Sequence, residues 1–350
     1  MPKRLSPFIS ALLIYCLAQQ ILPLAPAQLY NPISANYRFC RRSLKAGLAK
    51  ADYLCIGDSM VKYGISSSAI RTLTGKTTFN LAGPGACAVV NYYILSEALS
   101  DTPHAKAIII DFEPLITKNN PWETLNASSE ILTCGEWLDL CRNTKNFDGC
   151  SSLFLQIAFP LYRFHREICL NLFDKPETRR KELEMVQMFE KSWYENSGQT
   201  CAEPKPEPAY PWLEIVKERV PWTCHPLNEK YIERIFKLAK SKGVEVFWLL
   251  PPLHPLAQAE VTRLGLDQSY VAFARQLQSR FDNVTILDGR FLHYDASSFI
   301  GGTHLNSNGA KALSCCIGKY FSLCDSAKSS GVKSKWVILK ATDRSGAKLF

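Results

Sequence analysis

One serine and one distant histidine have residue types and settings suited to nucleophilic chemistry. Ser59 ends the run Gly57-Asp58-Ser59, directly after an apolar stretch, and His304 lies in a glycine-rich segment before the last helical pattern. A serine hydroxyl is a weak nucleophile unless a base lies within hydrogen-bond reach. The pair therefore predicts a Ser-His site, in which Ser59 attacks a carbonyl carbon and His304 takes its proton.

Alternating strand and helix patterns would bring these two residues together. Short apolar runs predict strands at 53–56, 77–81, 107–110, 244–250 and 284–287, and helical periodicity predicts helices at 86–99, 228–242, 267–280 and 307–323. Such repeats imply a parallel sheet with helices on both faces. Ser59 and His304 both fall in strand-to-helix loops, and these loops meet at one edge of a doubly wound sheet.

Composition limits the class of protein. The chain has 350 residues, 47% of them hydrophobic and 21% charged, which suits one core domain with an insertion. The formal net charge is +9, but the basic residues are dispersed along the sequence, which argues against nucleic-acid binding. Ordinary solubilising charge is the favoured interpretation, and attraction to anionic lipid or wall polymer is the alternative.

The first 27 residues have the pattern of an export signal. Lys3 and Arg4 precede an apolar stretch at 8–18, and Ala25-Pro26-Ala27 offers the small residues that a signal peptidase reads. We expect cleavage after Ala27 and a periplasmic, secreted or cell-envelope location. The alternative is an uncleaved segment that associates the protein with a membrane.

Thirteen cysteines suit an oxidising compartment. We expect one or more disulfides among the cysteines of the middle region, which are Cys134, Cys141, Cys150, Cys169, Cys201 and Cys224. Cys55 and Cys87 lie in apolar stretches typical of buried free thiols. No paired Cys/His spacing typical of zinc occurs, so we expect neither a metal nor another cofactor.

Two segments depart from the strand–helix rhythm. The stretch 119–224 carries helical patterns at 163–172 and 179–194 and a proline-rich run at 203–208. It reads either as a cap over the carboxyl edge of the sheet or as a surface elaboration without a substrate role. The basic segment 326–350 predicts a loosely ordered tail, which leaves 28–325 as the folded domain.

Three motifs resemble the blocks of the SGNH/GDSL hydrolases. Ile56-Gly-Asp-Ser-Met60 resembles their first block, 303–310 resembles their last, and Asn80-Leu-Ala-Gly-Pro-Gly85 looks like their second. The resemblance spans roughly 52–323 and is nearest to exported, cell-envelope members. It implies a flavodoxin-like, three-layer α/β/α sandwich with a mostly parallel sheet, interrupted here by the insertion at 119–224.

The resemblance also implies a reaction. Ser59 would be the nucleophile, His304 the base, and the backbone N–H groups of Ser59 and Gly85 the oxyanion hole. The substrate would be a small ester or an acylated, for example O-acetylated, polysaccharide. Water as acceptor would make the protein an esterase or deacylase, and a sugar hydroxyl would make it an O-acyltransferase.

Two positions depart from the family pattern. Gly301 stands where the family places an aspartate three residues before its histidine, so either Asp295 or a backbone carbonyl in a Ser-His dyad would orient His304. Glu113 ends the segment where the third block has an asparagine. The alternative function is therefore an envelope binding or assembly protein that keeps the fold without the chemistry.

Four further polar residues have simpler interpretations. Asp58 is expected to stabilise the turn before Ser59, and Asn306 to cap the last helix. His254 and His293 are expected to be capping or surface residues.

Overall fold

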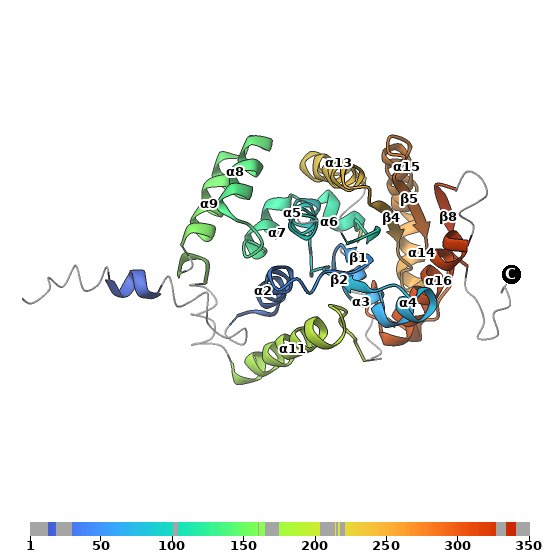
Figure 1. Ribbon diagram of the computed structural model, residues 1–350, viewed down its shortest axis with the longest axis horizontal. Coiled ribbons are helices and arrows are strands. Elements are labelled where there is room, and N and C mark those ends of the chain that lie inside the picture. Colours follow the sequence, from blue (N-terminus) through green and yellow to red (C-terminus); the bar gives the residue numbers. More distant parts are fainter. Residues whose placement is uncertain are drawn as a thin grey trace, which may run out of the picture.

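The protein is an α/β structure built on one parallel sheet (Figure 1). The computed structural model describes residues 13–18, 30–100, 104–159, 161–164, 175–203, 214, 216–217, 221–326 and 334–340. Six strands pair in the order β2-β1-β3-β4-β5-β8, with all neighbours parallel. Their bounds are β1 Tyr53–Ile56, β2 Thr78–Asn80, β3 Ala107–Ile110, β4 Glu245–Leu250, β5 Val284–Asp288 and β8 Trp336–Ile338. The predicted α/β class with a mostly parallel sheet is confirmed.

The strands are apolar on both sides because helices cover both faces of the sheet. In β1, Leu54 and Ile56 belong to one buried cluster, whereas Tyr53 and Cys55 belong to another. This alternation follows the two-residue period of a strand, which sends successive side chains to opposite faces. The two clusters define an arrangement of helix, sheet and helix layers.

Different helices complete each cluster. One face packs against α2 (Pro32–Lys45), α5 (Ala88–Ala98), α13 (Pro226–Ser241) and α15 (Leu266–Ser279). The other packs against α3 (Ser59–Gly64), α4 (Ser67–Thr74) and α16 (Ser307–Ser326). Helix α14 (Pro255–Arg263) follows β4, and His254 caps its start by accepting a hydrogen bond at Nδ1 from the N–H of Leu256.

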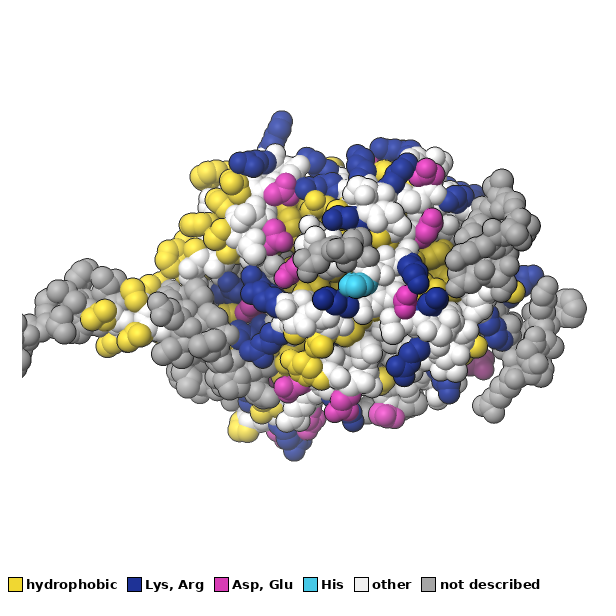
Figure 2. All heavy atoms as spheres, viewed as in Figure 1, with side chains coloured by type: hydrophobic (Ala, Val, Ile, Leu, Met, Phe, Trp, Pro, Cys, Tyr) yellow, Lys and Arg dark blue, Asp and Glu magenta, His cyan; other side chains and the backbone are white. Residues whose placement is uncertain are grey.

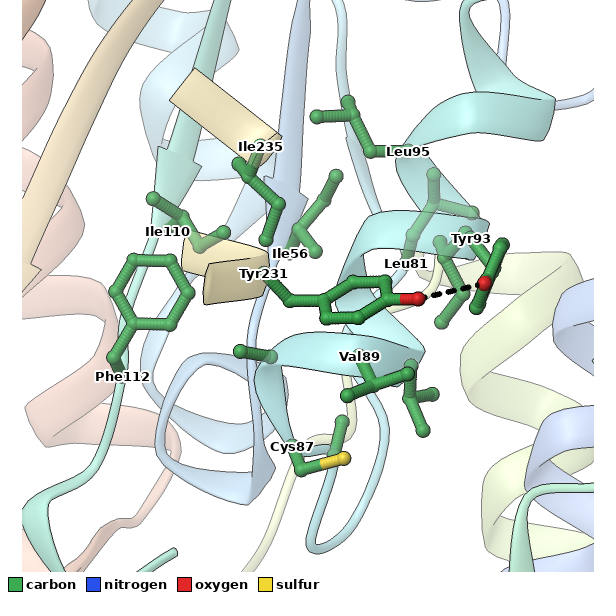
Figure 3. Packing of buried hydrophobic residues seen from close by; sticks show 14 of the residues in the cluster. Ile56, Leu81, Cys87, Val89, Tyr93, Leu95, Ile110, Phe112, Tyr231 and Ile235 are labelled. Atoms are coloured by element: carbon green, nitrogen blue, oxygen red, sulfur yellow. Dashed lines mark hydrogen bonds between the residues drawn. The ribbon is translucent and has the colours of Figure 1, made fainter. Parts of the chain in front are cut away.

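A hydrogen bond between two buried tyrosines joins α5 and α13 (Figure 3). The hydroxyl of Tyr93 donates to Asp139 at 2.8 Å and lies 2.9 Å from the hydroxyl of Tyr231. Since Tyr93 has its proton committed to Asp139, Tyr231 is the donor to Tyr93. Arg234 then pairs with Asp139 at 2.8 Å, so these polar groups join the insertion to the core without an unpaired charge.

The insertion consists of helices outside the sheet layers. Among the described residues they are α7 (Pro121–Ala127), α8 (Cys134–Asn143), α9 (Phe147–Ala158) and α11 (Pro176–Glu195), and the short helix α6 (Pro114–Lys118) leads into them from β3. Helix α11 coincides with the helix predicted at 179–194 and packs on α2. Most of the helix predicted at 163–172, and most of the proline-rich run at 203–208, lies outside the described residues.

The cysteines of the described residues are free thiols. Cys55 and Cys87 are buried, as expected of core thiols. In the middle region burial raises the pKa of the Cys141 thiol to about 12, and the nearby thiol of Cys150, which follows on α9, adds to the shift. Cys169 lies outside the described residues, and disulfide formation stays a prediction.

The segment expected to be a loose tail contains the last strand of the sheet. Strand β8 pairs with β5 in parallel, and the N–H of Leu339 donates to the carbonyl of Asp288 at 2.8 Å. Only the short run 336–339 is apolar in this basic segment, so its composition masked a strand. Outside 334–340, residues 327–350 are not among those described.

Candidate functional site

Ser59 is positioned by a sharp turn at the carboxyl end of β1. Gly57 has φ of +142°, and a Cβ atom there would lie 1.8 Å from Oδ1 of Asp111, so only glycine fits. Asp58 then caps α3, because its Oδ1 accepts from the N–H of Met60 at 2.7 Å. This confirms the predicted role of Asp58 and leaves Ser59 as the first residue of α3.

His304 comes from the opposite end of the chain. It begins β7 (His304–Leu305), which pairs antiparallel with β6 (Phe299–Ile300) just before α16. Asn306 accepts from the N–H groups of Asn308 and Gly309, both at 3.1 Å, and its Nδ2 donates to the carbonyl of Ser297. Asn306 is therefore the expected cap of α16, and it also fixes the loop that carries His304.

The structure brings the two predicted residues into direct contact. Nε2 of His304 lies 2.8 Å from Oγ of Ser59, across 245 positions of sequence. The Tyr63 ring packs beside the imidazole, with ring centroids 5.1 Å apart. This geometry allows His304 to accept the Ser59 proton, as a general base must.

Desolvation controls the protonation of His304. Burial lowers the pKa of its imidazole to about 4. The ring is therefore neutral at neutral pH, which leaves Nε2 free to accept a proton from Ser59.

Neither sequence candidate for orienting His304 is seen to contact it. Within the described residues, no hydrogen bond joins Nδ1 of His304 to Asp295 or to any other group. Gly301 has φ of +67°, in the left-handed region that glycine adopts at no steric cost, and it has no side chain to contact His304. The structure thus holds a Ser-His pair whose imidazole is positioned by packing and by its strand.

The expected oxyanion-hole loop lies beside the turn that carries Ser59. The N–H of Gly83 donates to the carbonyl of Gly57 at 3.1 Å, which holds the 81–86 loop against the turn. Asn80 bridges the loop and α3, since its Nδ2 donates to Val61 and its Oδ1 accepts from Ala82. Among the described residues, the N–H of Gly85 makes no hydrogen bond, so it is free to bind an anion.

A cluster of buried acids lies directly beneath Ser59, and sequence reasoning missed it. Oδ1 of Asp111 accepts from the N–H of Asp58 at 3.1 Å, and each of these two side chains is 1% exposed. Burial raises the pKa of Asp111 well above its usual range, and the charge of Asp58 raises it further. Burial also raises the pKa of Asp58, so the site disfavours two charged carboxylates side by side.

An apolar cavity begins at the residue after Ser59. It has an empty volume of about 510 Å³, including its mouth. Its apolar lining comes mainly from Met60, Phe112, Leu115, Leu250, Leu253 and Tyr270. Glu113 and Arg290 are polar groups in the same lining. The cavity lies between the ends of β3 and β4, where open α/β sheets bind ligands.

The end of α11 and the segment after it reach the same edge of the sheet. The carbonyl of Ser197 accepts from the N–H of Asn80 at 2.7 Å, and the N–H of Thr200 donates to the carbonyl of Lys62 at 3.1 Å. The Trp193 ring lies 3.7 Å from Nζ of Lys62, a lysine with no exposed surface. This part of the insertion therefore holds α3, the helix that carries Ser59, whereas the cap role stays a prediction.

His293, metal binding and membrane-spanning helices remain to be compared with the sequence expectations. His293 has φ of +52° and packs near Phe291, with no contact to the Ser-His pair among the described residues. In that same part of the chain, no group of three or more His, Cys, Asp or Glu side chains could hold a metal ion. Nor does any helix in the described ranges combine the length and apolar content needed to cross a bilayer.

Comparison with known proteins gives no functional assignment, so any assignment depends on the geometry of the site. The chain matches no protein-family model and no curated protein.

Proposed function

We propose that the protein is an SGNH/GDSL-type serine hydrolase or O-acyltransferase that acts on an ester-bearing carbohydrate or envelope substrate. The hydrogen bond of 2.8 Å between Ser59 and His304 carries the proposal. The parallel sheet, the turn at Gly57 and the placement of His304 before the last helix support the same family resemblance.

In the proposed reaction His304 takes the proton of Ser59 as its Oγ attacks the acyl carbonyl. The free N–H groups at Ser59 and Gly85 would stabilise the oxyanion, and removal of one such donor typically costs about 3 kcal/mol. His304 then returns the proton to the leaving alkoxide, and water or a sugar hydroxyl releases the acyl group from Ser59. The apolar cavity beside Met60 suits the acyl part of the substrate.

Hydrolysis of a short-chain aryl ester by the full chain tests the proposal. We expect Ser59→Ala and His304→Ala each to lower kcat by about 10³-fold or more, since each removes half of the catalytic pair. Ser279→Ala is the matched control, because Ser279 is an exposed hydroxyl at the end of α15. Equal rates in the wild type and all three variants would refute the proposal that the protein is an enzyme.

A second candidate function rests on two observations at the same site. His304 has no partner at Nδ1 in the described part of the chain, and Glu113 occupies the place of the third-block asparagine. Both features would suit an SGNH-fold envelope binding or assembly protein that lacks catalysis. Equal background hydrolysis in the wild type and both site variants would favour this candidate.

A further inference from the structure

Basic residues that are dispersed in the sequence gather around one cavity beside α2. Four of them recur on α2 with the spacing of one helix face, and these are Arg38, Arg41, Arg42 and Lys45. Arg163 approaches from the segment after α9 and completes the lining. The cavity, here the α2 cavity, is open to solvent and has an empty volume of about 810 Å³ when its mouth is included.

Glu130 is the carboxylate in the lining of the cavity, and Glu97 lies outside the lining near Arg41 and Lys45. Oε1 of Glu130 pairs with Nη1 of Arg38 at 3.2 Å and with Nη1 of Arg163 at 3.3 Å, so two guanidinium groups share it. Arg41 donates to the backbone carbonyl of Glu130 instead. Glu130 is the single acid in the described lining, and the α2 cavity therefore keeps an excess of positive charge.

Two of the cations are built into the protein rather than attached to its surface. Arg38 is 4% exposed and lies over the Tyr30 ring, 4.0 Å from its centroid. Arg163 donates from Nε to the carbonyl of Gln156 at 2.7 Å. Burial lowers the pKa of Arg163, Glu130 opposes that shift, and the charges of Arg41 and Arg38 add to it. An anion entering the cavity would relieve this crowding.

Exposed apolar side chains gather on the helices next to the cavity. They are Leu138, Phe147, Phe154, Leu155, Phe159 and Tyr162, here called the α9 patch. Phe147 is 81% exposed, an unusual position for a phenylalanine in a soluble protein. Figure 2 shows hydrophobic side chains over α8 and α9 beside a group of Lys and Arg side chains near α2. Ile157 and Phe164 continue the apolar surface into the cavity lining.

We propose that the α2 cavity and the α9 patch together dock the protein on an anionic phospholipid surface. Headgroup phosphates enter the cavity between Arg42, Lys45 and the buried arginines, while the apolar side chains of α9 enter the interface. Membrane-surface helices combine these two features, basic groups for the headgroups and apolar groups for the acyl boundary. A soluble anion would use the cavity alone and leave the α9 patch in water. This contact is additional to any made by residues 1–27.

Vesicle sedimentation with the full chain tests this surface. We expect wild-type protein to bind phosphatidylcholine vesicles containing about 30% phosphatidylglycerol at least tenfold more tightly than pure phosphatidylcholine vesicles. Arg42→Glu with Lys45→Glu should lower the anionic-vesicle affinity about tenfold or more, since both residues are exposed and outside the Glu130 pairs. Phe147→Ser with Leu155→Ser should weaken binding about tenfold while its salt dependence persists.

A control of equal charge separates local docking from net charge. Arg71→Glu with Lys311→Glu changes the charge by the same amount on α4 and α16, which cover the other face of the sheet. It should leave vesicle binding within about twofold of the wild type. Equal losses in the two charge variants would overturn the proposal. So would unchanged vesicle binding in the variant with Phe147→Ser and Leu155→Ser, because the cavity would then bind anions without the α9 patch.

Discussion

At the residue scale, burial without a charged partner lowers the pKa of two side chains near Ser59, His304 and Lys62. His304 is desolvated and has a partner only at Nε2 among the described residues. Lys62 is fully buried on α3, and within the described ranges its Nζ has no hydrogen-bond partner. Its Nζ lies over the face of the Trp193 ring, and this cation–π contact offsets part of the cost of removing the ammonium group from water. In both residues burial disfavours the charged form in the folded protein.

The first prediction concerns the titration of His304. Its pKa of about 4 lies below the ordinary histidine value of 6.5. The unfolded chain therefore binds more protons between these values, so the free energy of unfolding decreases as the pH falls from 6.5 towards 4. The imidazole resonances in NMR spectra, assigned with His304→Ala, should titrate near pH 4, and the acid limb of kcat/KM should follow them. A titration centred near pH 6.5 would contradict the desolvated environment.

A second prediction follows from Lys62. Burial lowers its pKa well below 10.5, so its stability contribution is lost as the pH falls from the unfolded lysine value. Lys62→Met keeps the length of the side chain, removes the charge and places sulfur over Trp193. We expect the free energy of unfolding at pH 7 to rise by about 2 kcal/mol, measured by urea denaturation.

The matched control for Lys62 lies on α11, the helix that carries Trp193. Lys191 has a side chain that is 67% exposed, so Lys191→Met should change stability by less than about 0.5 kcal/mol. A loss of stability in Lys62→Met would show that the buried amine is required by the fold.

Sequence reasoning could identify Ser59 and His304 but not the buried groups around them. Both predicted residues stand next to short motifs in loops, where residue type and local order carry the signal. Lysine is usually a surface residue, so nothing local marks Lys62 as buried. The hydrogen bond from the N–H of Asp58 to Asp111 depends on the pairing of β1 with β3, which joins positions 53 residues apart.

At the scale of elements, the long apolar and periodic segments were predicted well. Two elements beside segments of unusual composition, α2 and β8, were missed. The predicted strands at 53–56 and 107–110 coincide with β1 and β3, because continuous apolar runs mark strands covered on both faces. Helix α2 was missed, since it follows directly on the export-like segment and its arginines hide the apolar side. Strand β8 was missed because three residues in a basic tail carry little pattern.

The third prediction belongs to the α8–α9 pair. These helices are joined by a short link at 144–146, and the thiols of Cys141 and Cys150 lie near enough for Cys150 to raise the pKa of Cys141. With oxidised glutathione as the oxidant, the two thiols should form a disulfide while glutathione disulfide is reduced to two thiols. Peptide mapping under non-reducing conditions should show the linked pair, and the free energy of unfolding should rise by about 2 kcal/mol.

Core thiols provide the comparison for that experiment. Cys55 and Cys87 are buried and should remain unmodified in the folded protein under the same conditions. A Cys141→Ser variant should lose the stability gain. Mixed disulfides with glutathione at both Cys141 and Cys150, without a link between them, would contradict the prediction.

At the scale of the whole molecule, the sheet was predictable but the placement of the insertion was not. Alternating strands and helices imply a parallel sheet from local patterns alone. The insertion is attached by backbone hydrogen bonds such as those from Asn80 to Ser197 and from Ser307 to Ala202, which have no sequence signature. Its contact with α3 and α16 therefore appears only in three dimensions.

The long separation between Ser59 and His304 sets an order of events during synthesis. The strand that precedes Ser59 is made early, whereas His304 follows 245 residues later. At ribosomal rates of about 5–20 residues per second, the serine waits roughly 12–50 s for its base. Until then the hydroxyl of Ser59 is an ordinary alcohol, because it has no base beside it. The proposed Ser-His pair is therefore complete only after the segment that carries His304 has been made and has folded onto the strand that precedes Ser59.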